Sequence, residues 1–237
     1  MYALADGTER KLYLREVIMY LVISILLNSM GNGLTVACNM GSAMWTASAA
    51  NLAHDFHISI ATILIVYGLL SILINVILLR HFDWPRILGN LIFIFPYGYF
   101  VALWAKYFRY LGVDQLTIPE RIILDICGIL CLGIAISIYQ RVNVILHPND
   151  DMTNIIRFNY VHGNPIAAQM LNFAIPLSVV IILWISFKNV VAINVGTIIS
   201  LLFQGAIIGW SDTHVFTRLK HRITLIKSKK ETVVVDQ

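Results

Sequence analysis

The chain has 237 residues, of which 58% are hydrophobic and only 13% are charged. Soluble domains carry about 25% charged residues, so this composition excludes an ordinary soluble enzyme or binding domain and indicates an integral membrane protein. The net charge of +4 does not indicate nucleic-acid binding, because the basic residues fall in short connections and near the C-terminus, without interleaved aromatic residues or a recognised module.

Six apolar segments are long enough to cross a bilayer, which takes about 20 residues in a helix. The sequence therefore predicts an all-α polytopic membrane bundle of six transmembrane helices, with residues 1–217 forming a single membrane domain. The last two segments are joined by only a few residues and should form a tight antiparallel hairpin. The expected spans are residues 17–38, 60–79, 87–105, 122–139, 165–187 and 190–210.

The lysines and arginines predict the orientation of these spans. If the N-terminus is cytoplasmic, thirteen of them fall inside and four outside, which is a clear positive-inside bias. The first apolar run lacks a cleavage site and is expected to be a retained span. We therefore expect both termini in the cytoplasm. The basic tail, residues 218–237, fits either a solvated topology anchor or a segment lying on the anionic inner leaflet, with membrane lipids as partners.

Residues 39–59, NMGSAMWTASAANLAHDFHIS, lie between two apolar runs but are made of small and hydroxylated residues around Trp45. This stretch is too polar to span a bilayer and too favourable to helix for a plain loop. Backbone that does not span is tolerated at membrane depth only where protein or a water-filled cavity surrounds it. The sequence therefore predicts a non-spanning half-helix that enters a cavity.

An internal repeat is visible in the third and sixth apolar segments. Residues 89–98, GNLIFIFPYG, and residues 196–205, GTIISLLFQG, both place two glycines nine residues apart. The repeats would cover residues 15–106 and 120–212, with residues 143–164 as the counterpart of the half-helix. Because each repeat holds three spans, the second must enter from the opposite side. The sequence thus predicts two inverted three-helix repeats, each with a non-spanning half-helix, an architecture found in many secondary transporters.

Three stretches carry a resemblance to a known family: the run GNGLTVACNMGSAMWTASAANLA, the weaker second copy with HPNDD, and the late GTIISLLFQGAIIGW. With these motifs the chain resembles the YczE/YyaS/YitT family of bacterial integral membrane proteins. The chain has Met44 where that family often has proline. The resemblance implies a multi-pass protein of the bacterial cell (plasma) membrane and adds nothing about a substrate.

Polar residues within or beside the spans are the candidates for a ligand site, because unpaired polar groups in lipid are costly and usually face the bundle interior. Any one of them also fits a simple hydrogen bond between helices. The candidate ligand-binding residues are Trp45, Thr46, Asn51, Asn90, Asp150, Asp151, Gln169, Asn172 and Gln204.

Two of these candidates have two interpretations each. Trp45 fits an interfacial aromatic anchor, or the apolar wall of a pocket in which nearby hydroxyls orient a ligand. Asp150 and Asp151 follow Pro148, so either could be a helix N-cap, or a carboxylate that couples a cation or proton to transport.

No catalytic signature, metal-ligand spacing or cofactor motif occurs in the sequence, so we expect no enzyme activity, no metal and no cofactor. Pro96 and Gly98 form a candidate hinge in the third span. Gly205 and Gly209 form a GxxxG step that permits close helix contact within the fold or in a homodimer.

The leading hypothesis from the sequence is a transporter, a secondary carrier or exporter of a small solute through a central cavity between inverted repeats. Such a protein needs a hydrated cavity, here lined by Trp45, Asn90, Asp150, Gln169 and Gln204. The alternative is a non-transporting membrane scaffold or regulatory protein, in which these side chains only join helices. An intramembrane enzyme is the third hypothesis.

Overall fold

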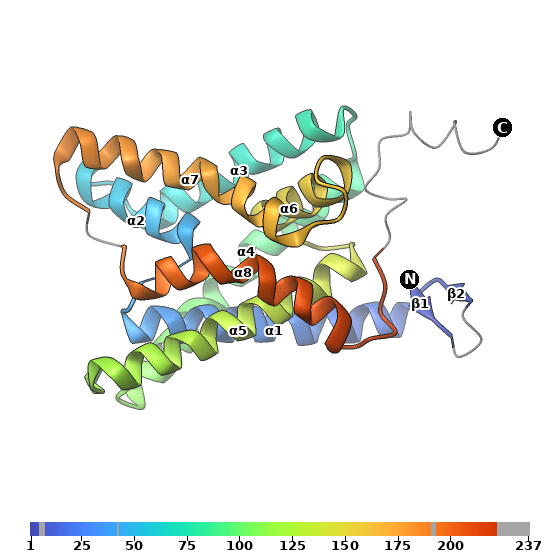
Figure 1. Cartoon of the computed structure of the whole chain (residues 1–237), viewed down its shortest axis with the longest axis horizontal. Helices are drawn as coiled ribbons and strands as arrows, with labels where there is room; N and C mark the ends of the chain where they lie inside the picture. The colour runs from blue at the N-terminus through green and yellow to red at the C-terminus, as the bar shows by residue number, and fades with distance from the viewer. Residues whose placement is uncertain (5–7, 42, 191–192, 222–237) are drawn as a thin grey trace.

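The computed structural model describes residues 1–4, 8–41, 43–190 and 193–221. In these residues the fold is helical except for a hairpin of two short strands at the N-terminus (Figure 1). The elements are β1 (Tyr2–Ala3), β2 (Glu9–Arg10), α1 (Leu14–Cys38), α2 (Met44–Phe56), α3 (Ile60–Leu79), α4 (Trp84–Tyr110), η1 (Val113–Gln115), α5 (Ile118–Val142), α6 (Pro148–Asn159), α7 (Pro165–Phe187) and α8 (Val195–His214).

Six of the helices, α1, α3, α4, α5, α7 and α8, are long and apolar enough to cross a membrane. The predicted number of spans is therefore confirmed, and the chain is a multi-pass membrane protein by the length and composition of its helices. Large apolar side chains remain exposed on the outer faces, for example Ile77 at 64% and Ile182 at 62%. Lipid contact accounts for this exposure, because a soluble protein would bury such surfaces.

Several helices begin or end away from the predicted boundaries, because polar residues at the membrane edge continue a helix without being apolar. α4 and α5 are longer than predicted; Thr117 and Glu120 form a capping box that starts α5 before its apolar run. α8 begins at Val195 rather than at residue 190, because Asn194 caps it by accepting a hydrogen bond from the backbone amide of Val195 (2.8 Å).

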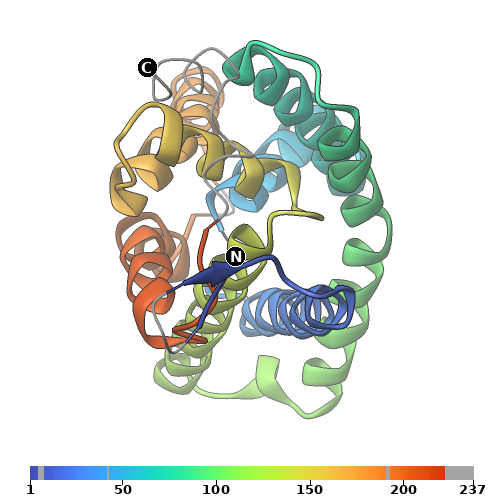
Figure 2. The same ribbon diagram turned by 90° about the vertical axis from the view of Figure 1, so that its right-hand side faces the viewer.

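The six long helices form a ring when the molecule is viewed end-on (Figure 2). On one side of the ring, α1 packs against α5, α4 lies beside α1, and α8 lies beside α5. α3 and α7 occupy the other side of the ring. The short helices α2 and α6 pack between α3 and α7, each in contact with both.

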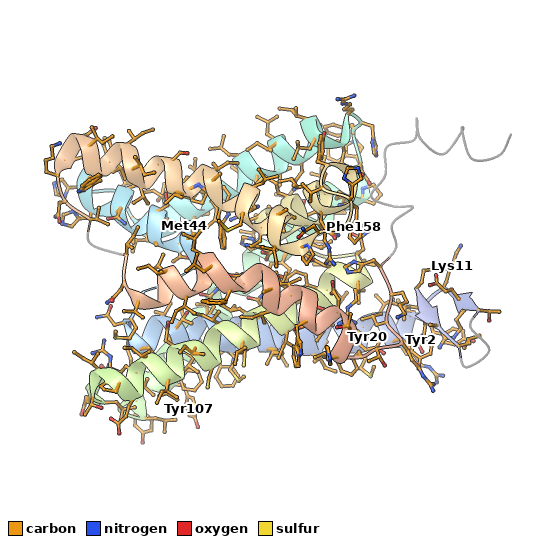
Figure 3. All side chains as sticks on the ribbon, viewed as in Figure 1. Tyr2, Lys11, Tyr20, Met44, Tyr107 and Phe158 are labelled. Atoms are coloured by element: carbon orange, nitrogen blue, oxygen red, sulfur yellow. The ribbon has the colours of Figure 1, made fainter. Side chains whose placement is uncertain are left out.

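The two short helices run in opposite directions along the long axis of the molecule (Figure 1). Each begins in the interior. Figure 3 places Met44, at the start of α2, well inside the bundle, and Phe158, near the end of α6, towards the end that carries the N-terminus. α2 and α6 have 13 and 12 residues. At 1.5 Å per residue they are about 20 Å long, shorter than the hydrocarbon core of about 30 Å.

The crossing of α1 and α5 depends on glycine. A Cβ atom on Gly31 would lie 2.8 Å from the carbonyl oxygen of Gly128, and one on Gly128 would lie 2.7 Å from the Cγ2 atom of Thr35. Small residues let two membrane helices approach closely enough for their backbones to pack. This contact is the centre of the fold and fixes the two longest buried helices against each other.

The N-terminal hairpin covers the end of the bundle where α8 finishes, a feature that the sequence did not predict. The amide of Ala3 donates to the carbonyl of Arg218 (2.8 Å), and the amide of Lys220 donates to the carbonyl of Met1 (2.8 Å). The predicted basic tail begins at residue 218, and its residues 222–237 lie outside the described residues. Both described chain ends therefore meet at one end of the molecule.

Candidate functional site

The first turn of α6 brings most of the polar chemistry of the bundle together. His147 caps the helix, with its Nδ1 atom 3.3 Å from the backbone amide of Asn149, and Pro148 occupies the first helical position. The expectation that Asp150 or Asp151 caps the helix is therefore wrong. Both aspartates lie within the first turn instead, where the positive end of the helix dipole stabilises a negative charge.

Asp151 forms a buried ion pair with Arg86 near the start of α4. The pair joins the Nη1 atom of Arg86 to the Oδ1 atom of Asp151, and the two residues are 9% and 0% exposed. The Nη2 atom of Arg86 lies 3.4 Å from Oδ1 of Asn143, and its Nε atom lies 3.7 Å from Oδ2 of Asp83. Because a buried charge must be paired, each member of this pair requires the other.

Asp150 starts a chain of hydrogen bonds that reaches three long helices. The hydroxyl of Tyr139 donates to Oδ2 of Asp150. The amide nitrogen of Asn28 donates to the Tyr139 hydroxyl (3.0 Å), and the hydroxyl of Tyr97 donates to Oδ1 of Asn28 (2.7 Å). The amide nitrogen of Asn32 donates to Tyr97 (2.5 Å). Side chains from α1, α4 and α5 thus converge on the start of α6.

The charge state of this region follows from its burial. Burial raises the pKa of Asp150 to about 7, although the hydrogen bond from Tyr139 acts in the opposite direction. Burial also lowers the pKa of His147 to about 4. The His147 ring packs edge-on against the rings of Phe93 and Tyr97. Asp150 remains half-buried whereas Asn149 and Asp151 are buried, so Asp150 is the acid of α6 that a small ligand could reach.

A second group of polar side chains holds the other face of the first turn. The Nδ2 atom of Asn172 donates to the carbonyl of Asn149 (2.8 Å), and the hydroxyl of Ser71 donates to Oδ1 of Asn149 (2.6 Å). The Nδ2 atom of Asn75 donates to the carbonyl of Pro148 (3.1 Å). These bonds fix α6 between α3 and α7 and use polar groups that lipid could not satisfy.

Trp45 on α2 joins this second group. Its Nε1 atom donates to Oδ1 of Asn172 (2.7 Å), and its ring packs edge-on against that of Tyr67 with 5.1 Å between the ring centroids. Ser48, one turn further along α2, lies 2.7 Å from the Tyr67 hydroxyl. Trp45 therefore packs inside the protein and is not an interfacial anchor.

The predicted ligand-binding residues separate into three sets. Asp150, Asp151 and Asn90 surround the start of α6; Asn90 donates to the carbonyl of Leu146 (2.9 Å). Trp45 and Asn172 join α2 to α7, and Asn172 also holds the first turn of α6. The remaining four lie elsewhere on α2, α7 and α8, where Thr46 is half-buried and the other three, Asn51, Gln169 and Gln204, are buried.

Four of the five residues expected to line a central cavity are packed instead. Trp45, Asn90, Gln169 and Gln204 are each at most 7% exposed. Gln204, for example, accepts a hydrogen bond from Ser200 on its own helix (2.6 Å). A cavity of about 370 Å³ lies elsewhere, on the apolar outer side of α7. Its lining residues are Leu177, Val180, Ile181, Trp184, Val190 and Ile193.

A third polar cluster lies where α8 ends. Asp212 pairs with Arg157 (2.6 Å from Nη1 to Oδ2) and accepts a hydrogen bond from Ser137 (2.7 Å). The Nη1 atom of the buried Arg141 donates to the carbonyls of Val215, Phe216 and Leu219 at 2.8, 3.1 and 3.2 Å. This cluster ties α5, α6 and α8 to the segment that follows α8 and closes that end of the bundle.

Comparison with known proteins assigns a family. Residues 14–213 match the family described as "Family of unknown function (DUF6198)". The chain belongs to the DUF6198 family. It is also 26% identical over 215 residues to the "Uncharacterized protein YyaS" of Bacillus subtilis (strain 168), covering 90% of this chain and 98% of that protein. The resemblance seen in the sequence motifs is thereby confirmed. No solved structure matches this DUF6198 protein.

Several residues of the buried polar clusters of this DUF6198 protein were not expected there from the sequence. Arg86, Arg141 and Arg157 are among the thirteen basic residues predicted to lie on the cytoplasmic side, and all three are buried. Tyr97 and Tyr139 were not among the candidate ligand-binding residues. The sequence does indicate that a buried acid of α6 requires a cationic partner, but which arginine supplies it depends on packing.

Proposed function

We propose that this protein is a carrier of a small solute in the bacterial plasma membrane, with its binding site at the start of α6. The convergence of Asn28, Tyr97 and Tyr139 on Asp150 carries the proposal. These side chains come from three different membrane helices and form one chain of hydrogen bonds that ends on a half-buried acid. Intramembrane ionisable residues are expensive and mark ligand or ion pathways in many membrane proteins.

Paired glycine contacts support two inverted repeats as the framework of this carrier. A Cβ atom on Gly33 in α1 would lie 2.4 Å from the Cβ of Trp104 in α4, and one on Gly133 in α5 would lie 2.4 Å from Cγ2 of Ile207 in α8. The first helix of each half thus packs on the last helix of the same half through a glycine.

A second pair of glycine contacts joins the two halves. The start of α4 packs on the segment after α5, and the start of α8 packs on the segment after α1. A Cβ on Gly89 in α4 would lie 2.5 Å from the carbonyl oxygen of Val144, and one on Gly196 in α8 would lie 3.0 Å from that of Met40. The first helix of each half ends in a left-handed asparagine, Asn39 (φ 50°) in α1 and Asn143 (φ 54°) in α5. The two halves therefore make equivalent contacts with each other, as expected for repeats related by a twofold axis in the membrane plane.

The chemistry of the site favours a small solute with hydrogen-bonding groups. Asp150, the two tyrosines and Asn28 offer hydroxyl, amide and carboxyl groups in a small space. Release to either side would require the two halves to separate around the start of α6. The present arrangement, with Asp212, Arg141 and Arg157 closing one end, corresponds to a closed state of such a carrier.

The packed positions of Trp45, Asn90, Gln169 and Gln204 favour a second candidate function. In a non-transporting scaffold or regulatory protein, these side chains would only join helices. This alternative predicts that no solute binds at Asp150. The GxxxG step at Gly205 and Gly209 packs within the fold on the start of α7, since a Cβ on Gly205 would lie 2.8 Å from the Cα of Ile166 and one on Gly209 would lie 2.7 Å from the Cγ of Pro165. The cytoplasmic position of both termini and a homodimer stay predictions under either function.

A solute screen with purified full-length protein tests the proposal. A ligand that binds the native state raises the apparent melting temperature by mass action. We expect at least one small polar solute to raise it in the wild type and in Ser178→Ala, a control variant on the exposed face of α7. The shift should be lost in Asp150→Asn and in Tyr97→Phe. A solute shift that survives in both site variants, or no flux of any hit into proteoliposomes, would contradict the proposal.

A further inference from the structure

Asp125 in α5 is a buried acid that the proposed solute site does not use. It is 1% exposed and lies within a membrane-spanning helix. The other acids buried in the bundle have polar partners: Asp151 pairs with Arg86, Asp212 with Arg157, and Asp150 accepts a hydrogen bond from Tyr139. Among the described residues, Asp125 has no ion pair, and its Oδ1 atom has no hydrogen-bond partner.

Asp125 lies where the segment after α1 meets the start of α8. Its Oδ2 atom lies 1.9 Å from the point where a Gly196 Cβ would stand, and the carbonyl oxygen of Met40 lies 3.0 Å from the same point. The amide of Gly196 donates to that carbonyl (2.8 Å). Asp125 thus lies beside the place where the segment after α1 meets the first turn of α8, and only glycine leaves room for it there.

Few charged or titratable groups face Asp125. On α5 itself, Arg121 lies one turn earlier, but its guanidinium donates to the carbonyls of Cys38 (2.6 Å) and Asn39 (3.1 Å). On α1, the thiol of Cys38 is close enough to interact electrostatically with Asp125. α8 contributes Gly196 and Thr197, neither of which titrates. The nearby buried cluster on α1 and η1 is apolar, with Ala37, Met40 and Val113 among its members.

A carboxylate in this position cannot remain charged without a partner. An isolated charge in an apolar environment costs so much free energy that the group neutralises instead. A protonated carboxyl has one O–H donor, and carbonyl oxygens lie nearby at the end of α1. If the start of α8 moved away from the end of α1, water would reach the acid and the charged form would become favourable.

We propose that Asp125 is a proton-binding site, which holds a proton while the segment after α1 is packed on the start of α8 at Gly196 and releases it when the two separate. Proton binding at Asp125 does not depend on what the protein transports. Its use to couple proton movement to solute movement rests on the proposed carrier function, in which α1 and α8 belong to opposite halves.

Labelling with dicyclohexylcarbodiimide tests proton binding directly. This apolar reagent adds to a protonated carboxyl in an apolar environment and leaves a stable adduct that mass spectrometry locates on a peptide. We expect purified full-length protein to be labelled at Asp125, with the labelling rate falling about tenfold for each pH unit above the pKa of the group. The measurement uses the wild-type protein, so the result does not depend on whether an Asp125 variant folds.

Two variants and one salt comparison control this experiment. Asp125→Asn should lose the adduct, while Asp114→Asn, at an exposed acid in η1, should keep it. Replacing choline chloride with sodium chloride at constant pH should leave the rate unchanged. No adduct at Asp125 at any pH, a rate independent of pH, or protection by sodium would each overturn the proposal. Solute binding at Asp150 could fail or succeed independently of these results.

Discussion

The two short helices α2 and α6 both pack between α3 and α7 but differ in chemistry. α6 has two aspartates in its first turn, and Asp151 is paired with Arg86 in the interior. α2 has no acid in its first turn and contacts its neighbours through Trp45, Ser48 and small residues. The start of α6 thus carries charged side chains, whereas the start of α2 carries apolar and hydroxyl side chains.

This difference shows where a polar ligand could bind. The N-terminus of a helix carries a partial positive charge that favours an anion, and both half-helices begin in the interior. Only α6 uses that position for acids. The start of α2 instead packs Met44 and Trp45 against Met152 and Ile156 of α6 in one apolar cluster. Under the proposed carrier function, α6 would bind the ligand and α2 would pack the interior with apolar side chains.

Breaking the Arg86–Asp151 pair should have the largest effect on stability. Removing one partner of a buried ion pair leaves an uncompensated charge and typically costs about 3–5 kcal/mol. We expect Arg86→Met to lower the free energy of unfolding by about this amount, measured by denaturant titration in detergent. The double variant Arg86→Met, Asp151→Leu should recover a substantial part of the loss. A double variant less stable than Arg86→Met would contradict the uncompensated-charge explanation.

Adding a methyl group at the paired glycines should have the next largest effect. Gly33→Ala and Gly133→Ala each place a Cβ 2.4 Å from a side chain of the helix packed against them. Overpacking of this kind costs about 1–3 kcal/mol, and the two losses should be similar if the halves are equivalent.

Gly98→Ala is the matched control for these variants. Gly98 also lies in a membrane helix, but a Cβ there meets nothing within 4 Å. Because alanine is a better helix former than glycine, this variant should be neutral or slightly more stable. A loss at Gly33 without a loss at Gly133 would show that the two halves do not pack equivalently.

Removing the indole donor of Trp45 should cost less. Trp45→Phe loses the hydrogen bond to Asn172 but keeps an aromatic ring beside Tyr67, so we expect a loss of about 1 kcal/mol. Asn172→Asp keeps an acceptor for the indole of Trp45 but loses the Nδ2 donor to the carbonyl of Asn149, and it serves as the comparison for the Asn172 side. A loss of stability in Trp45→Phe as large as that in Arg86→Met would contradict the interpretation that α2 contributes mainly apolar packing.

The smallest effect should be a pH dependence centred on Asp150. Its folded-state pKa of about 7 lies above its ordinary value, so the folded state binds the proton more tightly than the unfolded state. Stability from this group is present at low pH and is lost as the pH rises through about 7. His147, with a pKa of about 4, acts in the opposite direction only at acidic pH.

The window between pH 6.5 and 8.5 therefore isolates Asp150 from His147. We expect the melting temperature of the wild type to fall across this window more than that of Asp150→Asn, since the amide cannot ionise. Equal slopes for the two proteins would show that Asp150 titrates at its ordinary value. Because Asp150 is half-buried, solvent screens its charge and the effect should be modest.

Much of the fold was predictable because membrane helices leave a strong signal. Runs of about 20 apolar residues identified all six long helices. The half-helix around Trp45 was predictable because its composition fits neither a span nor a loop, and α6 followed from the glycine repeat. The N-terminal hairpin was not predictable, because strands of two residues have no periodicity and depend on contact with Leu219.

The candidate site was predictable only in part. Asp150 and Asp151 stood out as acids beside a span. Arg86 could not be assigned as their partner from the sequence, because 65 residues separate it from Asp151 and the pairing arises only from packing. Asp125 was hidden within an apolar run, where one acid does not change the prediction of a span. The four polar residues now found packed, Trp45 among them, show that polarity alone does not distinguish a cavity lining from a helix contact.

The central claim is that the two half-helices enter the membrane from opposite sides. Single cysteines at His57, after α2, and at His162, after α6, test it in a background without Cys38, Cys127 and Cys131. Both positions are exposed and have positive φ angles, 55° and 52°, so the substitutions are matched in strain. With a membrane-impermeant maleimide, we predict labelling of His57→Cys in intact cells and of His162→Cys only after the membrane is opened. Labelling of both cysteines from the same side would contradict the account.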